Sequence, residues 1–581
     1  MLLSPKNIFL LLLSINLLAL FVSFFNVSSF YKEEKLRKER YLAFIRETYK
    51  FSNSLIANLL LEQLDVFEEV DTFNGMASFD QFPFSIFLLT SNYCKARRAY
   101  FTENPSSIFI EKSLNFVTNY VLNHDLRTTV LPKFGSDIYP HLIEKTIYSY
   151  RVKREEFRTD IDGFVFVQDQ LSSINMVGKH YSCLSQISNH IPGHEILSRK
   201  DFIGNALVKY KREYMNRPEC FNYNKFFPQT WVLNQKEQCQ EFFEHFNSPE
   251  YQRLKEERTI VYFTKVGANV HGAKGVAPLN EKEEADLRVL YNGGELCGRN
   301  ANNTVIQYAV YNPQLLEGRK FDFRTFLLIA SSNPMIAYFH DGYLRMALFP
   351  YDVKSTEIGT FLPNSPLSKA VFETVRTNGS YYGLNAQEIK DRSYWLYPQL
   401  QEFLLKEGKI TDPNWLDNYL RPELKKAMIH LVRMSQKPLG AKSSVFELYG
   451  VDFMLDTNLN LWYIEANAQP LVRGWNPETV ELFNRMNAHS FEIVIGLLRS
   501  RMKRVINYVN MLIENSEEWS LEDGKMNIKD LDLRRAEFLE VSKNKFEPEF
   551  EPSAGNTFSK IIDENENGPE RYMGLLSNEC L

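Results

Sequence analysis

Several features that would assign this chain to a common functional class are missing from its sequence. Its formal net charge of -5 at pH 7 gives no global sign of a nucleic-acid partner, so any acidic partner must be met by a local basic groove. None of its six cysteines forms a pair at zinc-finger or redox-motif spacing, and free buried thiols are the expected state. No Ser-His-Asp or Cys-His arrangement indicates a protein nucleophile. These absences leave the cellular compartment open.

The length of the chain predicts several structural units. At 581 residues it exceeds what one hydrophobic core usually serves. Helix and strand signals alternate through the middle of the chain, which indicates an α+β or α/β enzyme. We expect a signal anchor or signal peptide at 1–30, a helical accessory region at 31–158, a catalytic domain at 159–510, and a charged, partly disordered tail at 511–581.

The N-terminus carries a nearly continuous apolar run at residues 8–25, about long enough to cross a bilayer. Basic residues between 32 and 40 follow it, which favours keeping the rest of the chain in the cytoplasm if the segment stays as a membrane anchor. A secretory signal cut near 27–29 is the alternative, and it would deliver the chain to a lumen. Asn302 and Asn378 begin glycosylation acceptor tripeptides, which are common by chance in a chain of this length.

Two stretches late in the chain, 446–456 and 461–467, predict a β-hairpin. Both are rich in aromatic and β-branched residues, and the connecting residues 457–460 are polar and turn-forming. We expect Asp456 to pair with Leu461 across this loop.

That register would place two carboxylates opposite each other. Asp452 would face Glu465, and the two-residue period of a strand puts Asn467 on the same side. A divalent cation would relieve the repulsion, and an all-oxygen donor set suits Mg²⁺ with nucleotide phosphates better than zinc. The alternative is a surface hairpin with solvated acids, and the apolar residues that alternate with them argue against it.

Two strands upstream are candidates for nucleotide contacts. Residues 259–265 form a β-rich run that ends in Lys265 and enters a glycine-bearing loop at 266–276, a combination that can present a cation and backbone N–H groups to phosphates. An ordinary hairpin turn is the alternative. The short strand 305–310 could offer main-chain groups of Ala309 and Val310 to an adenine edge, although alone it indicates only a strand.

A third segment alternates strictly between charged and aromatic residues over 319–329. Lys320, Asp322 and Arg324 share one face, where they could hold a γ-phosphate and a substrate carboxylate. A solvent-facing strand at the edge of a sheet, with its charges in salt bridges, would show the same alternating pattern and is the alternative. Further upstream, Ser198 is expected to cap a helix with Asp201 at its third position.

The order of these segments and the residues in them resemble those of the tubulin tyrosine ligase-like enzymes, a branch of the ATP-grasp ligases. The resemblance covers residues 185–498. It is carried by 189–193 with Lys200, 227–231, 318–324, 343–345, 362–364 with Lys369, and the hairpin 446–467.

What the resemblance implies can be placed residue by residue. It implies an ATP-grasp fold with an N-terminal subdomain and ATP and Mg²⁺ as cofactors. It implies nucleotide or substrate contacts from Lys200, Lys265, Gln307, Tyr308, Val310, Lys320, Asp322, Arg345 and Asn364. It implies Mg²⁺ ligation by Asp452, Glu465 and Asn467, and catalysis by Arg324, Lys320 and Asp322.

The reaction implied by the resemblance is ATP-dependent ligation of an amino acid to a protein carboxylate through an acylphosphate. Tubulin or microtubules would be the partner, glutamate the amino acid, and a cilium or the microtubule cytoskeleton the location. Tyr308 stands where the family usually has lysine, and Pro363 where it has threonine. An inactive scaffold that binds microtubules or membrane, or a ligase for another protein, therefore remains an alternative.

Overall fold

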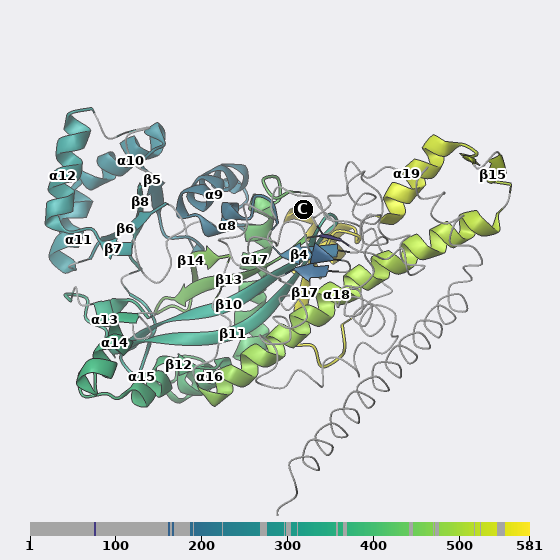
Figure 1. Ribbon diagram of the computed structural model, residues 1–581. Helices are drawn as coiled ribbons and strands as arrows, with labels where there is room; N and C mark the ends of the chain where they lie inside the picture. The colour runs from purple at the N-terminus through teal and green to yellow at the C-terminus, as the bar shows by residue number, and fades with distance from the viewer. Residues whose placement is uncertain are drawn as a thin grey trace, which may run out of the picture.

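The structure is a computed structural model in which a central sheet, a smaller sheet and a long helix dominate (Figure 1). It describes residues 75–76, 161–162, 165–167, 186–189, 191–542 and 552–580. The stretch 191–542 has gaps at 223–224, 259, 268–275, 295–296, 298–303, 311, 356–357, 364–368, 441–444, 469, 471–475, 516 and 523–524.

The central sheet contains nine strands in the described part of the chain. They are β3 (Val165–Val167), β4 (Gln186–Asn189), β9 (Leu315–Leu316), β10 (Arg319–Ser332), β11 (Met335–Pro350), β12 (Tyr394–Trp395), β13 (Val445–Leu455), β14 (Leu461–Asn467) and β17 (Ser559–Asp563). The order β12-β11-β10-β13 is antiparallel, β14 extends it beyond β13, and β4 joins β13 and β3 in parallel.

Strand β10 lies between β11 and β13, and all fourteen of its residues are buried. Its aromatic and aliphatic side chains face the main hydrophobic core, which includes Phe321, Phe323 and Leu327. The charged residues that alternate with them are therefore also enclosed, and the alternative of a solvent-facing strand edge is excluded. Charges in such a place need partners or ligands.

A smaller antiparallel sheet has the order β5-β8-β6-β7. Its strands are β5 (Thr230–Val232), β6 (Tyr262–Val266), β7 (Val276–Pro278) and β8 (Thr304–Tyr308), with the helices α10 (Lys236–Phe246), α11 (Pro249–Glu257) and α12 (Glu281–Asn292) beside them. The core between these elements is rich in aromatic residues such as Trp231, Phe242 and Tyr262. Figure 1 shows this unit at one end of the central sheet.

The remaining helices cover the central sheet or extend from it. They are α8 (Glu195–Ser198), α9 (Lys200–Tyr214), α13 (Ile358–Phe361), α14 (Lys369–Asn378), α15 (Ala386–Ser393), α16 (Tyr397–Lys406), η9 (Leu416–Leu420), α17 (Arg421–Ser435), α18 (Pro477–Glu514), α19 (Leu531–Ser542), η10 (Gly568–Tyr572) and η11 (Asn578–Cys580). Two small sheets pair β1 (Gly75–Met76) with β2 (Ile161–Asp162) and β15 (Trp519–Glu522) with β16 (Lys525–Ile528). The long helix α18 begins where the Asn476 side chain accepts a hydrogen bond from the Thr479 N–H at 2.9 Å, with proline in its first turn.

The mixture of helices and a largely antiparallel sheet confirms the α+β prediction. Within the part of the chain that is described, no helix combines the length and the apolar content needed to cross a bilayer. This finding corrects the expectation of a membrane-anchored protein facing the cytoplasm, and the membrane is withdrawn as a partner. The apolar run 8–25 and most of the expected accessory region lie outside the described residues.

The last part of the chain belongs to the folded core. Strand β17 pairs antiparallel with β11, and Ile561, Ile562 and Tyr572 are buried in the main hydrophobic core. The Glu492 carboxylate of α18 accepts hydrogen bonds from the Ser553 N–H and hydroxyl at 2.8 and 3.0 Å. The prediction of a disordered end is therefore wrong for 552–580, where few periodic apolar residues are needed because a single short strand completes an existing sheet.

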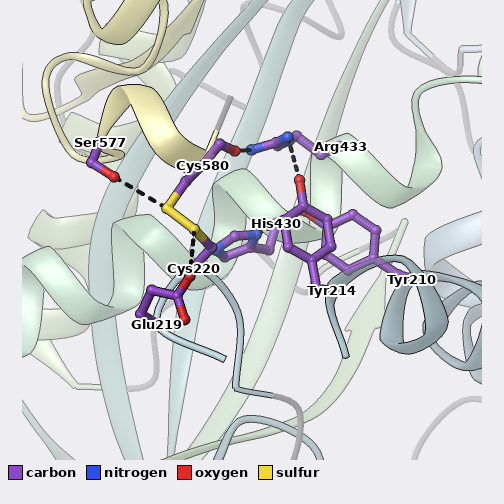
Figure 2. Close-up of a disulfide and its surroundings, with 8 residues drawn as sticks. All are labelled: Tyr210, Tyr214, Glu219, Cys220, His430, Arg433, Ser577 and Cys580. Atoms are coloured by element: carbon purple, nitrogen blue, oxygen red, sulfur yellow. Dashed lines mark hydrogen bonds between the residues drawn. A yellow bond between two sulfur atoms is a disulfide. The ribbon is translucent and has the colours of Figure 1, made fainter. Parts of the chain in front are cut away.

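A disulfide fixes this C-terminal segment to the body of the protein. Cys580 is bonded to Cys220, 360 positions earlier, and both are buried (Figure 2). Beside the bond, Arg433 donates hydrogen bonds to the Cys580 carbonyl at 2.8 Å and to the Tyr214 hydroxyl at 2.5 Å. A second disulfide joins Cys239 on α10 to Cys297, within the smaller unit.

These bonds correct the expectation of free thiols. No cysteine in the described ranges is free. The spacing of cysteines along the chain could not reveal the pairing, because each bond closes a long loop whose ends meet only in the folded structure.

Candidate functional site

The site forms where the central sheet meets the smaller one. Strands β10, β11, β13 and β14 supply most of the charged side chains, strands β6 and β8 supply two more polar ones, and α9 supplies Lys200 at its start. The sheet register explains which side chains meet. Asp322 lies opposite Arg345 of β11, and Arg324 lies opposite Asp452 of β13.

The hairpin has the predicted strands, and its register matches the expectation only in part. Leu455, rather than Asp456, pairs with Leu461. A bulge after Asp452 then restores the predicted pairing of Asp452 with Glu465.

Asp456 has a different task in this hairpin. Its carboxylate accepts hydrogen bonds from the turn, including the Asn458 and Asn460 N–H groups at 2.9 Å, and from the Trp462 indole at 3.1 Å. It therefore stabilises the turn that brings the two strands together.

The three predicted metal ligands are brought to one place. Asp452 and Glu465 are cross-strand partners, and the Asn467 amide donates to the Glu465 carboxylate at 3.3 Å. Burial alone would raise the pKa of Glu465, but Lys200, Lys265 and two arginines lower it to about 2. Glu465 is therefore an ionised carboxylate at neutral pH, and carboxylate and amide oxygens are the kinds of donor that Mg²⁺ accepts.

Two arginines hold Asp452. Arg324 donates to both of its carboxylate oxygens at 2.5 and 2.9 Å, and Arg345 donates to one of them at 2.7 Å. Arg345 also binds Asp322 through two hydrogen bonds of 2.7 Å, so it bridges two buried carboxylates. Gly450 makes room for this arrangement, because a Cβ atom there would lie 3.0 Å from the Arg324 Cδ. Paired bidentate geometry of this kind fixes the side chains firmly.

Two lysines of the site have no acidic partner of their own. Lys265 donates to the Gln307 amide oxygen at 2.5 Å, and the Lys320 ammonium lies 5.8 Å from the centre of the Tyr351 ring. Neither forms an ion pair within the described residues, although both are buried. Burial lowers the pKa of each lysine to about 8, despite nearby carboxylates. Buried cations without counter-ions favour an anionic ligand, and these fit nucleotide phosphates.

A pocket opens beside these groups. Charged and polar residues that line it include Lys200, Lys265, Gln307 and Glu465, and the Lys200 ammonium lies 3.3 Å from the Glu465 carboxylate. Figure 1 shows the start of α9 and strand β14 near each other at this position.

The predicted capping role of Ser198 is wrong. The residue before α9 is Arg199, which makes no side-chain cap, and Asp201 instead pairs with the Arg199 guanidinium at 2.8 and 3.1 Å. The Ser198 hydroxyl has no hydrogen-bond partner among the described residues, although it is buried and its residue lines the pocket.

The expected adenine strand is present as β8. The Gln307 amide oxygen accepts a hydrogen bond from the Lys265 ammonium, and the Gln307 amide nitrogen donates to the Thr230 hydroxyl at 2.9 Å. The Tyr308 main-chain N–H donates to the Gln229 carbonyl, and its ring packs 5.1 Å from the Arg258 guanidinium. The Tyr308 side chain therefore belongs to the aromatic core of the smaller unit.

Other expected positions are placed less fully. Val310 follows β8 and is half-buried. Asn364 and the glycine-bearing loop at 268–275 lie outside the described residues. Their roles stay predictions.

Reasoning from the sequence missed Tyr463. It lies on β14 two residues before Glu465, is fully buried, and lines the pocket. A two-residue period already places Tyr463 with Glu465, but an aromatic residue within a strand indicates packing in the core and carries no signal for a pocket.

Comparison with known proteins identifies the class. The model of the tubulin-tyrosine ligase family matches residues 178–503. The chain therefore belongs to the tubulin-tyrosine ligase family, as its motifs predicted.

Curated relatives have several names within this class. An inactive polyglycylase TTLL10 of Homo sapiens is 27% identical over 301 residues, which cover 50% of this chain and 41% of the relative. A tubulin monoglycylase TTLL3 of Homo sapiens is 25% identical over 46% of this chain and 33% of the relative. A tubulin polyglutamylase TTLL7 of Mus musculus is 24% identical over 67% of this chain and 42% of the relative. The matches thus span less than half the length of these relatives.

Proposed function

We propose that this chain is an ATP-dependent ligase that joins the amino group of an amino acid to a carboxylate of tubulin. The observation that carries the proposal is the pair of buried lysines, Lys265 and Lys320. Among the described residues neither forms an ion pair, and both lie near the cross-strand pair of Asp452 and Glu465. Lysines of this kind suit nucleotide phosphates, and the carboxylates suit the Mg²⁺ that accompanies them.

The chemistry of such a ligase needs no protein nucleophile. A carboxylate oxygen of the acceptor attacks the terminal phosphorus of ATP and releases ADP; the amine then attacks the acyl carbon and releases phosphate. Bound Mg²⁺ would supply charge neutralisation at the phosphates, and Asp452, Glu465 and Asn467 would hold it.

The side chains of the site can each be given a part in this reaction. Lys265 and Lys320 would neutralise phosphate charge from the buried floor of the site. Arg324 uses its Nε and one terminal nitrogen on Asp452, and its other terminal nitrogen makes no hydrogen bond within the described residues. That nitrogen could steady the transferred phosphoryl group. Arg345, held by Asp322 and Asp452, would keep both acids in place.

The amino acid is the finer part of the proposal. We retain glutamate as the first candidate, and the name of the TTLL7 relative is consistent with it. Glycine is the second candidate, because the TTLL10 and TTLL3 relatives are named as glycylases.

The test is incubation of the full chain with tubulin, Mg²⁺-ATP and one labelled amino acid at a time. We expect label on tubulin from glutamate, and loss of that label in Glu465→Gln, which removes the charge and keeps the shape. Label from glycine alone would assign a glycylase. No label from any amino acid would contradict the ligase proposal.

An inactive ligase fold is the second candidate. It is favoured by the engagement of Asp452 with two arginines, which compete with a metal for its oxygens. This candidate predicts co-sedimentation with microtubules that survives Glu465→Gln, together with no transfer of label in either form.

A further inference from the structure

The smaller unit is joined to the rest of the protein at two places beside the candidate site. At one of them, β5 packs so closely on α9 that a Cβ atom on Gly204 would lie 2.8 Å from a methyl carbon of Val232. The Gln238 amide nitrogen also donates to the Asn205 amide oxygen there, at 2.9 Å. The other contact involves the end of α11 and the residues that follow β11.

This other contact is a clamp formed by residues 256–258 and 351–354. The Glu256 carbonyl, near the end of α11, accepts a hydrogen bond from the Lys354 ammonium at 2.8 Å. A cation is favourable at a helix C-terminus, because the last carbonyl groups have no partner within the helix. Arg258 follows as the residue that ends α11, and it is only 1% exposed. Two distant segments of the chain therefore hold the smaller unit to the end of β11.

Arg258 interacts with an aromatic residue of each unit. Its guanidinium lies 5.1 Å from the centre of the Tyr308 ring, within the range of a cation–π interaction. Burial raises the pKa of the Tyr351 hydroxyl, and the nearby Arg258 charge opposes this rise. A lysine at position 308, as in the family, would bring a second cation to Arg258, whereas the ring of Tyr308 attracts it. The clamp is thus matched to this chain's own residue at 308.

The two halves of the clamp lead to the two buried lysines of the site. The Tyr351 N–H donates to the Gly318 carbonyl at 2.8 Å, just before Lys320 in the chain, and the Lys320 ammonium lies 5.8 Å from the centre of the Tyr351 ring. The other half, at the end of α11, is followed by β6, which carries Lys265. The clamp therefore forms a short connection between two lysines that belong to different sheets.

Resting on the proposed function, we propose that this clamp sets the spacing of Lys265 and Lys320, so that both bind the phosphates of one nucleotide. A triphosphate would extend from the smaller sheet to the central one and would need both lysines aligned. Adenosine would need only the expected adenine strand, β8, within the smaller unit. Lys354, Arg258 and Tyr351 are positioning residues in this scheme.

The test uses Lys354→Met in the full chain, because Lys354 is exposed and the change keeps the length of the side chain. Lys354→Arg is the conservative variant, since arginine can still donate to the Glu256 carbonyl. Lys426→Met is the matched control, because Lys426 is a partly exposed lysine that bonds within its own helix, to Glu423 at 3.0 Å. Hydrogen–deuterium exchange is measured on the ligand-free protein. Calorimetry measures binding of adenosine and of a Mg²⁺-bound, non-hydrolysable ATP analogue.

We expect Lys354→Met to speed the exchange of backbone amides at 249–258 and 351–355, and to leave the hairpin 446–467 unchanged. Binding of the ATP analogue should weaken about 2- to 5-fold, the range for loss of a cation at a helix C-terminus that leaves the aligned state less populated. Adenosine should bind as it does to the wild type. Lys354→Arg and Lys426→Met should resemble the wild type in every measurement.

Three results would overturn the inference. Unchanged exchange at 351–355 in Lys354→Met would show that this ammonium does not hold the two units together. Faster exchange with unchanged binding of the ATP analogue would show that the clamp does not set the spacing of the lysines. An equal loss of adenosine binding would show that the variant disturbs the smaller unit itself.

Failure of the proposed function would look different. A wild-type chain that binds neither ligand would refute that function and would remove the nucleotide role from the clamp. The exchange of the ligand-free variants would still decide whether the clamp joins the two units.

Discussion

Removal of the Cys220–Cys580 disulfide tests whether the C-terminal segment is held by a covalent bond. The bond closes a loop of 360 residues, and loops of this length restrict the unfolded chain strongly. Loss of a native disulfide typically costs about 2–5 kcal/mol. For a cooperative unit about the size of the family-matched region, this corresponds to a fall of about 3–7 °C in the thermal midpoint.

The native segment should stay in place without the bond, because other contacts hold it. These include the pairing of β17 with β11 and the Arg433 hydrogen bond to the Cys580 carbonyl. We therefore expect Cys580→Ser to lower the midpoint without changing the secondary structure of the folded state. Differential scanning fluorimetry and circular dichroism measure the two quantities.

The double variant provides the control. Cys220→Ser, Cys580→Ser and their combination each remove the same single bond, so their effects should be equal rather than additive. Cys239→Ser removes the Cys239–Cys297 disulfide, which closes a loop of only 58 residues, and is expected to lower the midpoint less. The reasoning fails if the native protein, without reductant, is alkylated at Cys220 or if Cys580→Ser melts with the wild type.

Three further predictions concern the site and its frame. Burial lowers the pKa of Lys265 to about 8, so between pH 8 and 10.5 this lysine binds more protons in the unfolded chain than in the folded one. Its contribution should therefore make the ligand-free protein more stable as pH rises, which thermal melting across this range measures. Nucleotide binding should weaken over the same range because Lys265 loses its charge, and calorimetry measures this. Asp322→Asn leaves Arg345 with one carboxylate instead of two, and it should lower the free energy of unfolding, measured with denaturant, by about 3–5 kcal/mol. A change below about 1 kcal/mol would instead mean that water compensates for the lost charge. Gly342→Ala should prevent folding of the sheet, because the new Cβ atom would lie 1.9 Å from a backbone oxygen of β10. The control is Gly379→Ala, where φ is similarly positive but the new Cβ would meet open space; it should lower the free energy of unfolding by only about 1 kcal/mol.

The hairpin of the site could be predicted because its signal is local. A polar turn between two β-rich runs fixes the strands, and the two-residue period then brings Asp452 near Glu465. The bulge could not be predicted, since it depends on how β13 and β14 twist against their neighbours. The consequence was a wrong starting pair at Asp456.

Contacts between distant parts of the chain could not be predicted either. The sequence shows that Asp322 and Arg324 share a face, but only the order of the strands brings Arg345 and Asp452 to them. The capping signal at Ser198 failed because this residue ends α8, and α9 begins only at Lys200, after Arg199. Residues 559–563 look unremarkable in sequence, because a strand that completes an existing sheet needs little propensity of its own.

Strand β17 has a consequence for the way this protein is made. It covers part of the outer edge of β11, beside the residues that pair with β12. Because synthesis runs from the N-terminus, the rest of the sheet can assemble while that edge is still bare, and bare edges invite pairing with other chains. Synthesis of β17, which follows that of the family-matched region 178–503, is then the step that covers this edge and protects it from aggregation.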